Sequence, residues 1–190
     1  MTLATLERNP HGVDLGALGP RIPGVLRTPT GKIELAPETI MSDVERLHES
    51  LGSSNGSIVL VDRRQLRSNN SWMHNLDVLV KGKERCTLHL HPDDADRLGI
   101  ANGGTAWVRS RTGEVAVTVE VTDAIMPGVV SIPHGWGHGI GGTDLSVAAG
   151  RPGVNSNLLA DGDLFDPLSG NAVLNGIPVQ VEAHAAPTPA

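Results

Sequence analysis

The apolar residues of the chain fall into short runs that are typical of β-strands. Val115, Val117, Val119 and Val121 alternate with alanine, threonine and glutamate, the pattern of a strand with one buried face. Shorter apolar runs, bounded by polar or turn residues, occur before and after it. We therefore predict strands over 57–61, 87–90, 106–110, 114–122, 129–132 and 177–181, with the third and fourth forming a hairpin around residues 111–113.

Two segments have the spacing or the end signals of α-helices. Apolar residues recur at helical intervals over 38–51, so one amphipathic helix is predicted there. A second, short helix is predicted to start at Pro92, because proline suits a first helical turn and two acidic residues follow it. Gly99 is placed to end this helix.

The remaining segments lack such a period and contain many turn residues. Residues 1–36 are rich in proline and are predicted to form an extended linker arm. We predict a binding domain over 37–184, with its barrel over about 57–182, and a disordered tail over 185–190. Short strands at close spacing with two short helices favour a mainly β fold that closes into a barrel. They argue against the alternative, a doubly wound sheet.

Length, charge and cysteine content narrow the class of protein further. The 190 residues suffice for about one domain with an arm. The 15 basic and 21 acidic side chains give a net charge of -6, which argues against nucleic-acid or membrane binding by bulk attraction. The single cysteine, Cys86, excludes an internal disulfide and cysteine-built metal or iron–sulfur sites. Because no signal-peptide pattern and no long apolar segment occur, we expect no membrane contact and a cytoplasmic location.

Three motif-like patterns have simpler structural explanations. Residues 52–56 spell G-x-S-x-G, but a helix precedes and a strand follows, the reverse of a hydrolase nucleophile elbow. Residues 137–142 spell G-x-G-x-x-G, but the next segment is too short for the crossover helix of a nicotinamide site. His134 and His138, like His89 and His91, form a pair without an obvious third metal ligand. We therefore expect no metal ligand and no catalytic residue in this chain.

The polar stretch over 63–75 carries a stronger chemical signal. It holds three arginines, one glutamine, two serines and three asparagines within thirteen residues. A solvated loop is the plain explanation of such a run. However, guanidinium groups offer forked donors to phosphate, and amides supply paired donors and acceptors to a heterocycle. A ligand with both phosphates and a purine-like or pterin-like ring would use all of these groups, and Asn157 and Asn175 add further amides near strand ends.

Several separated segments, taken in order, closely resemble one known family. They are LVDRRQLRSNNS at 60–71, HPDDA at 91–95 with LGI at 98–100, VTD at 121–123 with PGVV at 127–130, PHGWG at 133–137 and NSNLL at 155–159. Together they resemble the carboxy-terminal molybdopterin-dinucleotide-binding domain of the molybdenum/tungsten bis-pterin oxidoreductases. That family includes formate dehydrogenases, periplasmic nitrate reductases and dimethyl sulfoxide reductase. The resemblance covers about residues 57–181, and residues 22–37 look like the segment that leads into the domain.

The resemblance implies a double-psi β-barrel whose loop after the first strand contacts a molybdopterin guanine dinucleotide. In that loop it assigns cofactor contacts, with the arginines on phosphate, to Arg64, Gln65, Arg67, Ser68, Asn69, Asn70 and Ser71. By position, the resemblance also assigns cofactor contacts to His134, Trp136, Gly137 and Asn157. It assigns one more to Asn175, where many relatives carry a lysine. His74 and Asn75 are additional positional matches.

The resemblance also implies what the chain does not contain. In the family, the residue that ligates molybdenum and the cysteines of the iron–sulfur cluster lie in upstream domains. The implied function is to bind and position the cofactor, which itself holds molybdenum or tungsten, as the C-terminal domain or small subunit of an oxidoreductase. Such a chain is not catalytic alone, and its partners are the upstream catalytic domains or a large subunit. The alternative is a double-psi barrel that acts as a protein-interaction module, which has no need of the polar cluster over 64–71.

Overall fold

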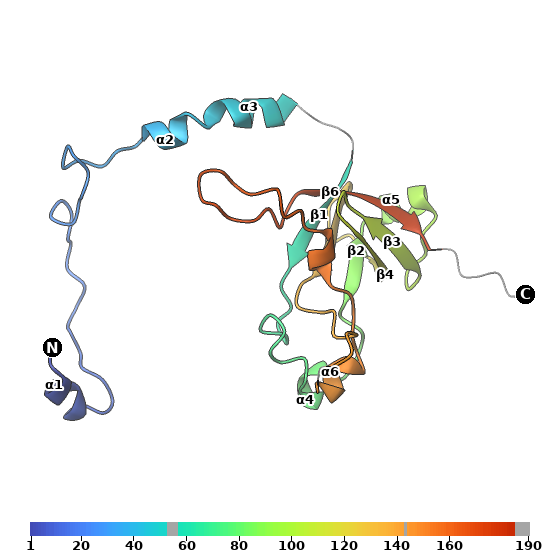
Figure 1. The fold of residues 1–190 in the computed structure, drawn as a ribbon, viewed down its shortest axis with the longest axis horizontal. Coiled ribbons are helices and arrows are strands. Elements are labelled where there is room, and N and C mark those ends of the chain that lie inside the picture. The colour runs from blue at the N-terminus through green and yellow to red at the C-terminus, as the bar shows by residue number, and fades with distance from the viewer. Residues whose placement is uncertain (53–56, 143, 185–190) are drawn as a thin grey trace, which may run out of the picture. The chain divides into compact units, whose positions relative to one another are not determined.

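The structure is a computed structural model that describes residues 1–52, 57–142 and 144–184. The chain divides into two compact units, Met1–Arg46 and Leu47–Ala190 (Figure 1). The proposed tail over 185–190 and most of the G-x-S-x-G pattern lie outside the described residues. The predicted boundary between an arm over 1–36 and a domain over 37–184 stays a prediction.

The N-terminal part of the chain contains short helices with no buried residue. They are α1 (Leu3–Glu7), α2 (Glu38–Met41) and α3 (Val44–Gly52). Helix α1 was not expected from the sequence, and it begins where the side chain of Thr2 accepts a hydrogen bond from the Thr5 amide. Residues 8–37 contain neither helix nor strand, as Figure 1 shows.

The prediction of a single helix over 38–51 is wrong in one respect, because the structure contains two helices separated by a turn at Ser42 and Asp43. The Ser42 hydroxyl donates to the Thr39 carbonyl, and the Asp43 carboxylate accepts two hydrogen bonds from Arg46. The Ser42 hydroxyl thus occupies a main-chain carbonyl of the preceding turn, and the Asp43 amide donates to the Ile40 carbonyl, three residues back, instead of to that of Thr39. This competition with helical backbone bonds explains the interruption.

Six strands form a closed barrel, as the apolar pattern predicted. They are β1 (Ile58–Arg63), β2 (Thr87–Leu90), β3 (Thr105–Arg109), β4 (Glu114–Val121), β5 (Val129–Pro133) and β6 (Ile177–Ala183). Each lies within two residues of its predicted bounds at both ends. The hairpin of β3 and β4 is also present, with Arg109 opposite Glu114.

The strand order is that of a double-psi β-barrel. Around the closed barrel it runs β1-β5-β2-β4-β3-β6, with β1 parallel to β5 and β2 parallel to β4. The connection from β1 to β2 passes across β5, and the connection from β4 to β5 passes across β2. Exchanging the first three strands for the last three leaves this cyclic order unchanged, so the barrel consists of two equivalent, interlocked halves. The predicted fold is therefore confirmed.

The barrel interior is filled by the apolar face of each strand. In β4 the side chains of Val115, Val117 and Val119 are buried while Thr118 is exposed, as the alternation predicted. Leu88 and Leu90 on β2 are fully buried. Burying side chains of this size contributes roughly 1.5–3 kcal/mol each, so this core is the main source of stability for the barrel.

Short helices lie on the connections between strands. Helix α5 (Pro92–Leu98) follows its prediction: His91 caps its N-terminus by accepting from the Asp93 amide, and Gly99 ends it at a φ of 65°. Helices α4 (Asp77–Val80) and α6 (Ser146–Ala149) and the 3-10 helix η1 (Ser156–Leu159) were not predicted. Each has four residues, which is too short to show a helical period. In the described part of the chain, no helix is both long and apolar enough to cross a membrane.

Candidate functional site

The carboxyl ends of strands β1 and β5 meet at one edge of the barrel. The two strands are parallel neighbours, with Arg63 opposite Pro133. The amide of His134 donates to the carbonyl of Arg63 at 3.2 Å, so both following loops leave the barrel together. The polar stretch after β1 therefore lies beside the glycine-containing segment after β5, although the two are about seventy residues apart in the sequence.

A groove of about 540 Å³ opens at this edge. This volume is within the range of about 300–1,000 Å³ that is usual for small-molecule sites. Eight residues line it: Asp62, Arg63, Arg64, His134, Gly135, Asn157, Leu174 and Asn175. Leaving His134 uncounted, two arginines and one aspartate contribute a charge of +1 to this lining, whereas the whole chain, with its histidines likewise uncounted, carries -6. The groove is thus a local cationic site on an acidic protein.

Hydrogen bonds between the two loops hold the groove side chains in place. The side-chain oxygen of Asn70 accepts from Arg64 Nη1 at 3.4 Å and from His134 Nε2 at 3.1 Å. Because an amide oxygen only accepts, Nε2 of His134 carries a hydrogen in this arrangement. His134 Nδ1 lies 2.7 Å from Asp62 Oδ2, and the Asp62 amide donates to the Asn175 side chain at 2.8 Å. One imidazole therefore bridges the loop after β1 and the strand that precedes it.

The two loops also touch through their main chains. Gly135 has a φ of 92°, and a Cβ at this position would lie 2.7 Å from the carbonyl carbon of Asn70 and closer still to its oxygen. Asn69 and Asn70 adopt the left-handed region themselves, with φ values of 44° and 61°. Asparagine and glycine tolerate this region, which explains these residue types at the crossing.

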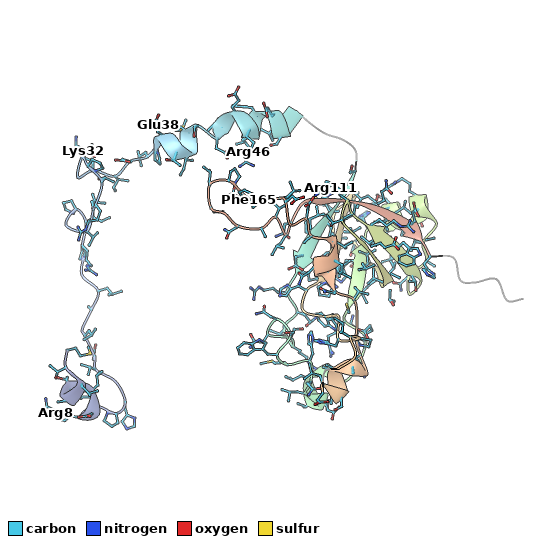
Figure 2. The ribbon with its side chains drawn as sticks, viewed as in Figure 1. Arg8, Lys32, Glu38, Arg46, Arg111 and Phe165 are labelled. Carbon is cyan, nitrogen blue, oxygen red and sulfur yellow. The ribbon has the colours of Figure 1, made fainter. Side chains whose placement is uncertain are left out.

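The segment between η1 and β6 also contributes to the groove, through Leu174 and Asn175. Arg111, which Figure 2 labels, lies in the turn between β3 and β4. Its guanidinium donates to Asp161 at 2.6 Å and to Asp163 at 3.2 Å. These ion pairs attach the start of this segment to the barrel.

Next to the groove, a second cluster joins the same two loops in the interior. Ser68 and His74 are 2% and 3% exposed, and their Oγ and Nε2 atoms are 2.8 Å apart. His74 Nδ1 is 2.8 Å from His138 Nε2, and its ring packs against Trp136. Burial lowers the pKa of His74, and the neighbouring His138 lowers it further. The cluster is a packed internal contact without a solvent-accessible hydroxyl, so it supports the loops rather than forming a nucleophilic site.

The structure brings some of the predicted binding residues together and separates others. Arg64, His134, Asn157 and Asn175 line the groove, and Asn70 contacts two of them. Ser68 and Trp136 belong to the internal cluster, and Gly137 packs against Asn155. The remaining predicted residues lie on the loop after β1 without lining the groove: Gln65, Arg67, Asn69 and Ser71.

The sequence-based prediction omitted four of the lining residues. Asp62 and Arg63 are at the end of β1. Asp62 directly precedes the predicted polar stretch, and Arg63 is its first residue but was given no cofactor contact, although the charge of both was a signal that could have included them. Gly135 and Leu174 carried no signal of their own, because only the meeting of distant segments places them here. Of the additional matches, His74 is buried, and the Asn75 side chain accepts from the Val147 and Ala148 amides at the start of α6.

Neither histidine pair is arranged as a metal site. His134 contacts Asn70 and Asp62, whereas His138 contacts His74. His91 caps helix α5. Across the residues that the structure describes, no group of three or more His, Cys, Asp or Glu side chains is placed to hold a metal ion.

Cys86 is expected to be unreactive in the folded protein. Its side chain is 4% exposed, its sulfur accepts from the Val154 amide at 3.3 Å, and burial raises the thiol pKa to about 11. At pH 8 only about one thiol in a thousand would be ionised, and the thiolate is the reactive form. We predict that a disulfide reagent such as DTNB labels Cys86 about a hundredfold or more slowly in native protein than in guanidinium-unfolded protein. Equal labelling rates would contradict the buried position.

The fold and the groove define a small barrel module with a cationic groove at the carboxyl ends of two parallel strands. A family profile described as the molydopterin dinucleotide binding domain matches residues 58–178, which is more than half of the chain. The chain belongs to this family, and its cofactor is of the molybdopterin type. The resemblance stated from the sequence motifs is thereby confirmed.

Relatives of the chain are molybdopterin-family oxidoreductases of much greater length. One tetrathionate reductase polypeptide of Salmonella typhimurium is 31% identical over 110 residues, which cover 49% of this chain and 11% of that protein. Biotin sulfoxide reductase of Cereibacter sphaeroides is 28% identical over 132 residues, covering 68% and 17%. Acetylene hydratase from Pelobacter acetylenicus has a similar fold, with a TM-score of 0.61 and 24% identity over 83% of this chain and 24% of that one. The chain thus spans a small part of the proteins it matches.

Proposed function

We propose that this chain binds the guanine dinucleotide form of a molybdopterin cofactor in the groove between the loops after β1 and β5. In this function it acts as the C-terminal domain or small subunit of a molybdenum or tungsten oxidoreductase and is not catalytic alone. The observation that carries the proposal is the groove itself. It is cationic, it has the volume of a small-molecule site, and it lies within the segment that matches the family.

The residues of the groove fit such a ligand chemically. Arg63 and Arg64 supply donors for phosphate, and Asn157 and Asn175 supply amides for ring or ribose groups. Asp62 Oδ1 is buried and has no hydrogen-bond partner among the described residues. A carboxylate only accepts, so the amino and ring N–H groups of a guanine or pterin are a match for it.

The mechanistic role of the chain is positioning. When bound, the cofactor supplies the redox chemistry through the metal at its dithiolene groups. The arginines of this chain would neutralise the phosphates, while Asn70 and His134 keep the two loops in register. We further propose that the partner is the catalytic portion of a larger oxidoreductase, because the relatives extend far beyond the matched segment.

A titration with GDP tests this function. We expect saturable NMR shifts of backbone amides at 63–64, 134–135, 157 and 175, and weaker binding of CDP and ADP. Arg64→Ala is expected to weaken GDP binding about tenfold or more, since a charge-assisted hydrogen bond contributes about 1.5–3 kcal/mol. Arg8→Ala, which removes the same charge from the N-terminal part of the chain (Figure 2), should leave the affinity unchanged.

The same titration distinguishes cofactor binding from the alternative function, that of a protein-interaction module. A protein-interaction module has no requirement for Arg64, so it would show no saturable shift at millimolar GDP. Shifts that saturate but lie outside the groove residues would count equally against the proposal.

A further inference from the structure

Two imidazole rings, those of His74 and His138, join the loop after β1 to the segment after β5. Nδ1 of His74 lies 2.8 Å from Nε2 of His138, and the ring planes meet edge to face at 85°. On the other side of its ring, His74 Nε2 lies 2.8 Å from the Ser68 hydroxyl, and the ring packs against Trp136 with centroids 4.1 Å apart. His74 is buried and His138 is half-buried, so of the two rings only that of His138 is partly open to solvent.

The contact between the two rings depends on how many protons they carry. A hydrogen bond between two ring nitrogens needs a hydrogen on one of them only, and two neutral rings meet this requirement. One added proton is also tolerated, because it can occupy Nδ1 of His138, the nitrogen that does not face His74. A second added proton puts a hydrogen on both facing nitrogens. Two donors and two positive charges then meet in a partly buried place, and the bond between the rings is lost.

The charges around His74 disfavour that second proton. Four charged side chains from the segment before β2 and from the end of α6 line a small cavity beside the ring: Lys83, Glu84, Arg85 and Arg151. Three are basic and one is acidic, so they carry a net charge of +2. Burial lowers the pKa of His74 and the neighbouring His138 lowers it further, while a main-chain acceptor at Gly135 opposes both effects. His74 therefore gains its proton only below the ordinary histidine pKa of about 6.5.

Separation of the rings would act on the groove through the loops that carry them. The loop with His74 also carries Arg64 and Asn70, and the segment with His138 also carries His134. A charged His74 can donate to the Gly135 carbonyl, and the half-buried His138 can turn towards water. The rings then part, and one of the ties between the two loops is lost.

We propose that the contact between His74 and His138 is a pH switch, closed while at most one of the two rings is charged and open when both are charged. Opening loosens the groove in acid and weakens ligand binding there, a consequence that rests on the proposed function. The direction follows from linkage. Because the pKa of His74 is lower in the folded than in the unfolded chain, the contact stabilises the loops fully above about pH 6.5, and this stabilisation is lost as the pH falls through the lowered pKa.

The first test follows the ligand-free chain by NMR from about pH 8 to about pH 5. Ring-nitrogen signals report the charge on each imidazole, and nuclear Overhauser contacts between side chains 74 and 138 report whether the switch is closed. We expect the wild type to lose these contacts as the second ring becomes charged. His138→Gln should keep them, because a glutamine oxygen accepts from His74 whether or not that ring is charged. His48→Gln, at an exposed position of α3, is the matched control and should behave like the wild type.

The second test measures GDP affinity by calorimetry at about pH 7.5 and about pH 5.5. The wild type and His138→Gln should bind GDP equally at the higher pH. At the lower pH the wild type should bind about threefold or more weakly than His138→Gln. Comparing the two proteins at one pH cancels the protonation of GDP itself, which is the same for both.

Each outcome decides a separate point. Side-chain contacts that persist when both rings are charged, or rings that never both become charged within this range, would overturn the switch and leave the proposed function intact. Loss of the contacts with equal GDP affinities of the two proteins at the lower pH would overturn the link to the groove. If the contacts are lost in acid but GDP binds at neither pH, the switch is supported and the proposed function is wrong. The wild-type NMR titration decides the switch even if His138→Gln fails to fold.

Discussion

Gly135→Ala is expected to lower the free energy of unfolding by about 3 kcal/mol or more and to abolish GDP binding. Gly135 combines a φ of 92° with a main-chain contact, since a Cβ would collide with the Asn70 carbonyl. The clash is with backbone, so no side-chain rotation relieves it. The loop after β1 would have to move away from the loop after β5, and Arg64 and His134 would separate. Urea denaturation followed by circular dichroism measures the first effect, and the GDP titration measures the second.

Gly103→Ala separates the collision from the backbone strain. Gly103 has a φ of 78°, but no atom lies within 4 Å of the position that a Cβ would take. The cost expected there is about 1–2 kcal/mol, from the left-handed conformation alone, and GDP binding should be retained. Equal losses of stability in the two variants would show that the loops are not in contact at Gly135.

Asp94→Asn is expected to destabilise the barrel by about 2–3 kcal/mol at pH 7. The Asp94 side chain, on α5, is buried and accepts from Arg97 Nη2 and from the Gly128 amide, both at 2.6 Å. It thereby fixes the turn that precedes β5. An asparagine keeps the shape of the side chain but loses its charge. Its NH2 group, which is itself a donor, must then face either Arg97 Nη2 or the Gly128 amide. Asp96→Asn, an exposed neighbour on the same helix, is the control and should change stability by less than about 0.5 kcal/mol.

The effect of Asp94 should depend on pH in one direction. Burial alone would raise the pKa of this carboxyl, but the hydrogen bonds from Arg97 and Gly128 outweigh burial and lower it. A carboxyl whose pKa is lower in the folded state stabilises the protein fully above about pH 4, and this contribution is lost as the pH falls through the lowered pKa. The stability difference between wild type and Asp94→Asn should therefore be largest at neutral pH and shrink towards pH 2. A difference that stays constant with pH would argue against an ionised Asp94.

Local patterns in the sequence predicted the elements of the barrel well. The valine alternation of β4 and the apolar runs of the other strands located each strand within two residues, because a half-buried strand repeats every second residue. Helix α5 was predicted from its end signals, proline and glycine, which act over one turn. The interruption at Ser42 and Asp43 escaped the same reasoning, since the competition of the Ser42 hydroxyl for a main-chain carbonyl does not alter the apolar period. The family was found through ordered motifs, and the profile match confirmed it.

The sequence by itself determined the strands, the family and the part of the chain that holds the polar loop. Only the tertiary structure decided which polar residues share one site. Ser68 and Asn70 are two residues apart, yet one is buried against His74 and the other contacts the groove residues Arg64 and His134. Asp62 and Asn175 are 113 residues apart and are hydrogen-bonded. Neighbours in sequence are separated and distant residues joined because the closed strand order, with its two crossing connections, sets which loops meet, and no local period encodes that order.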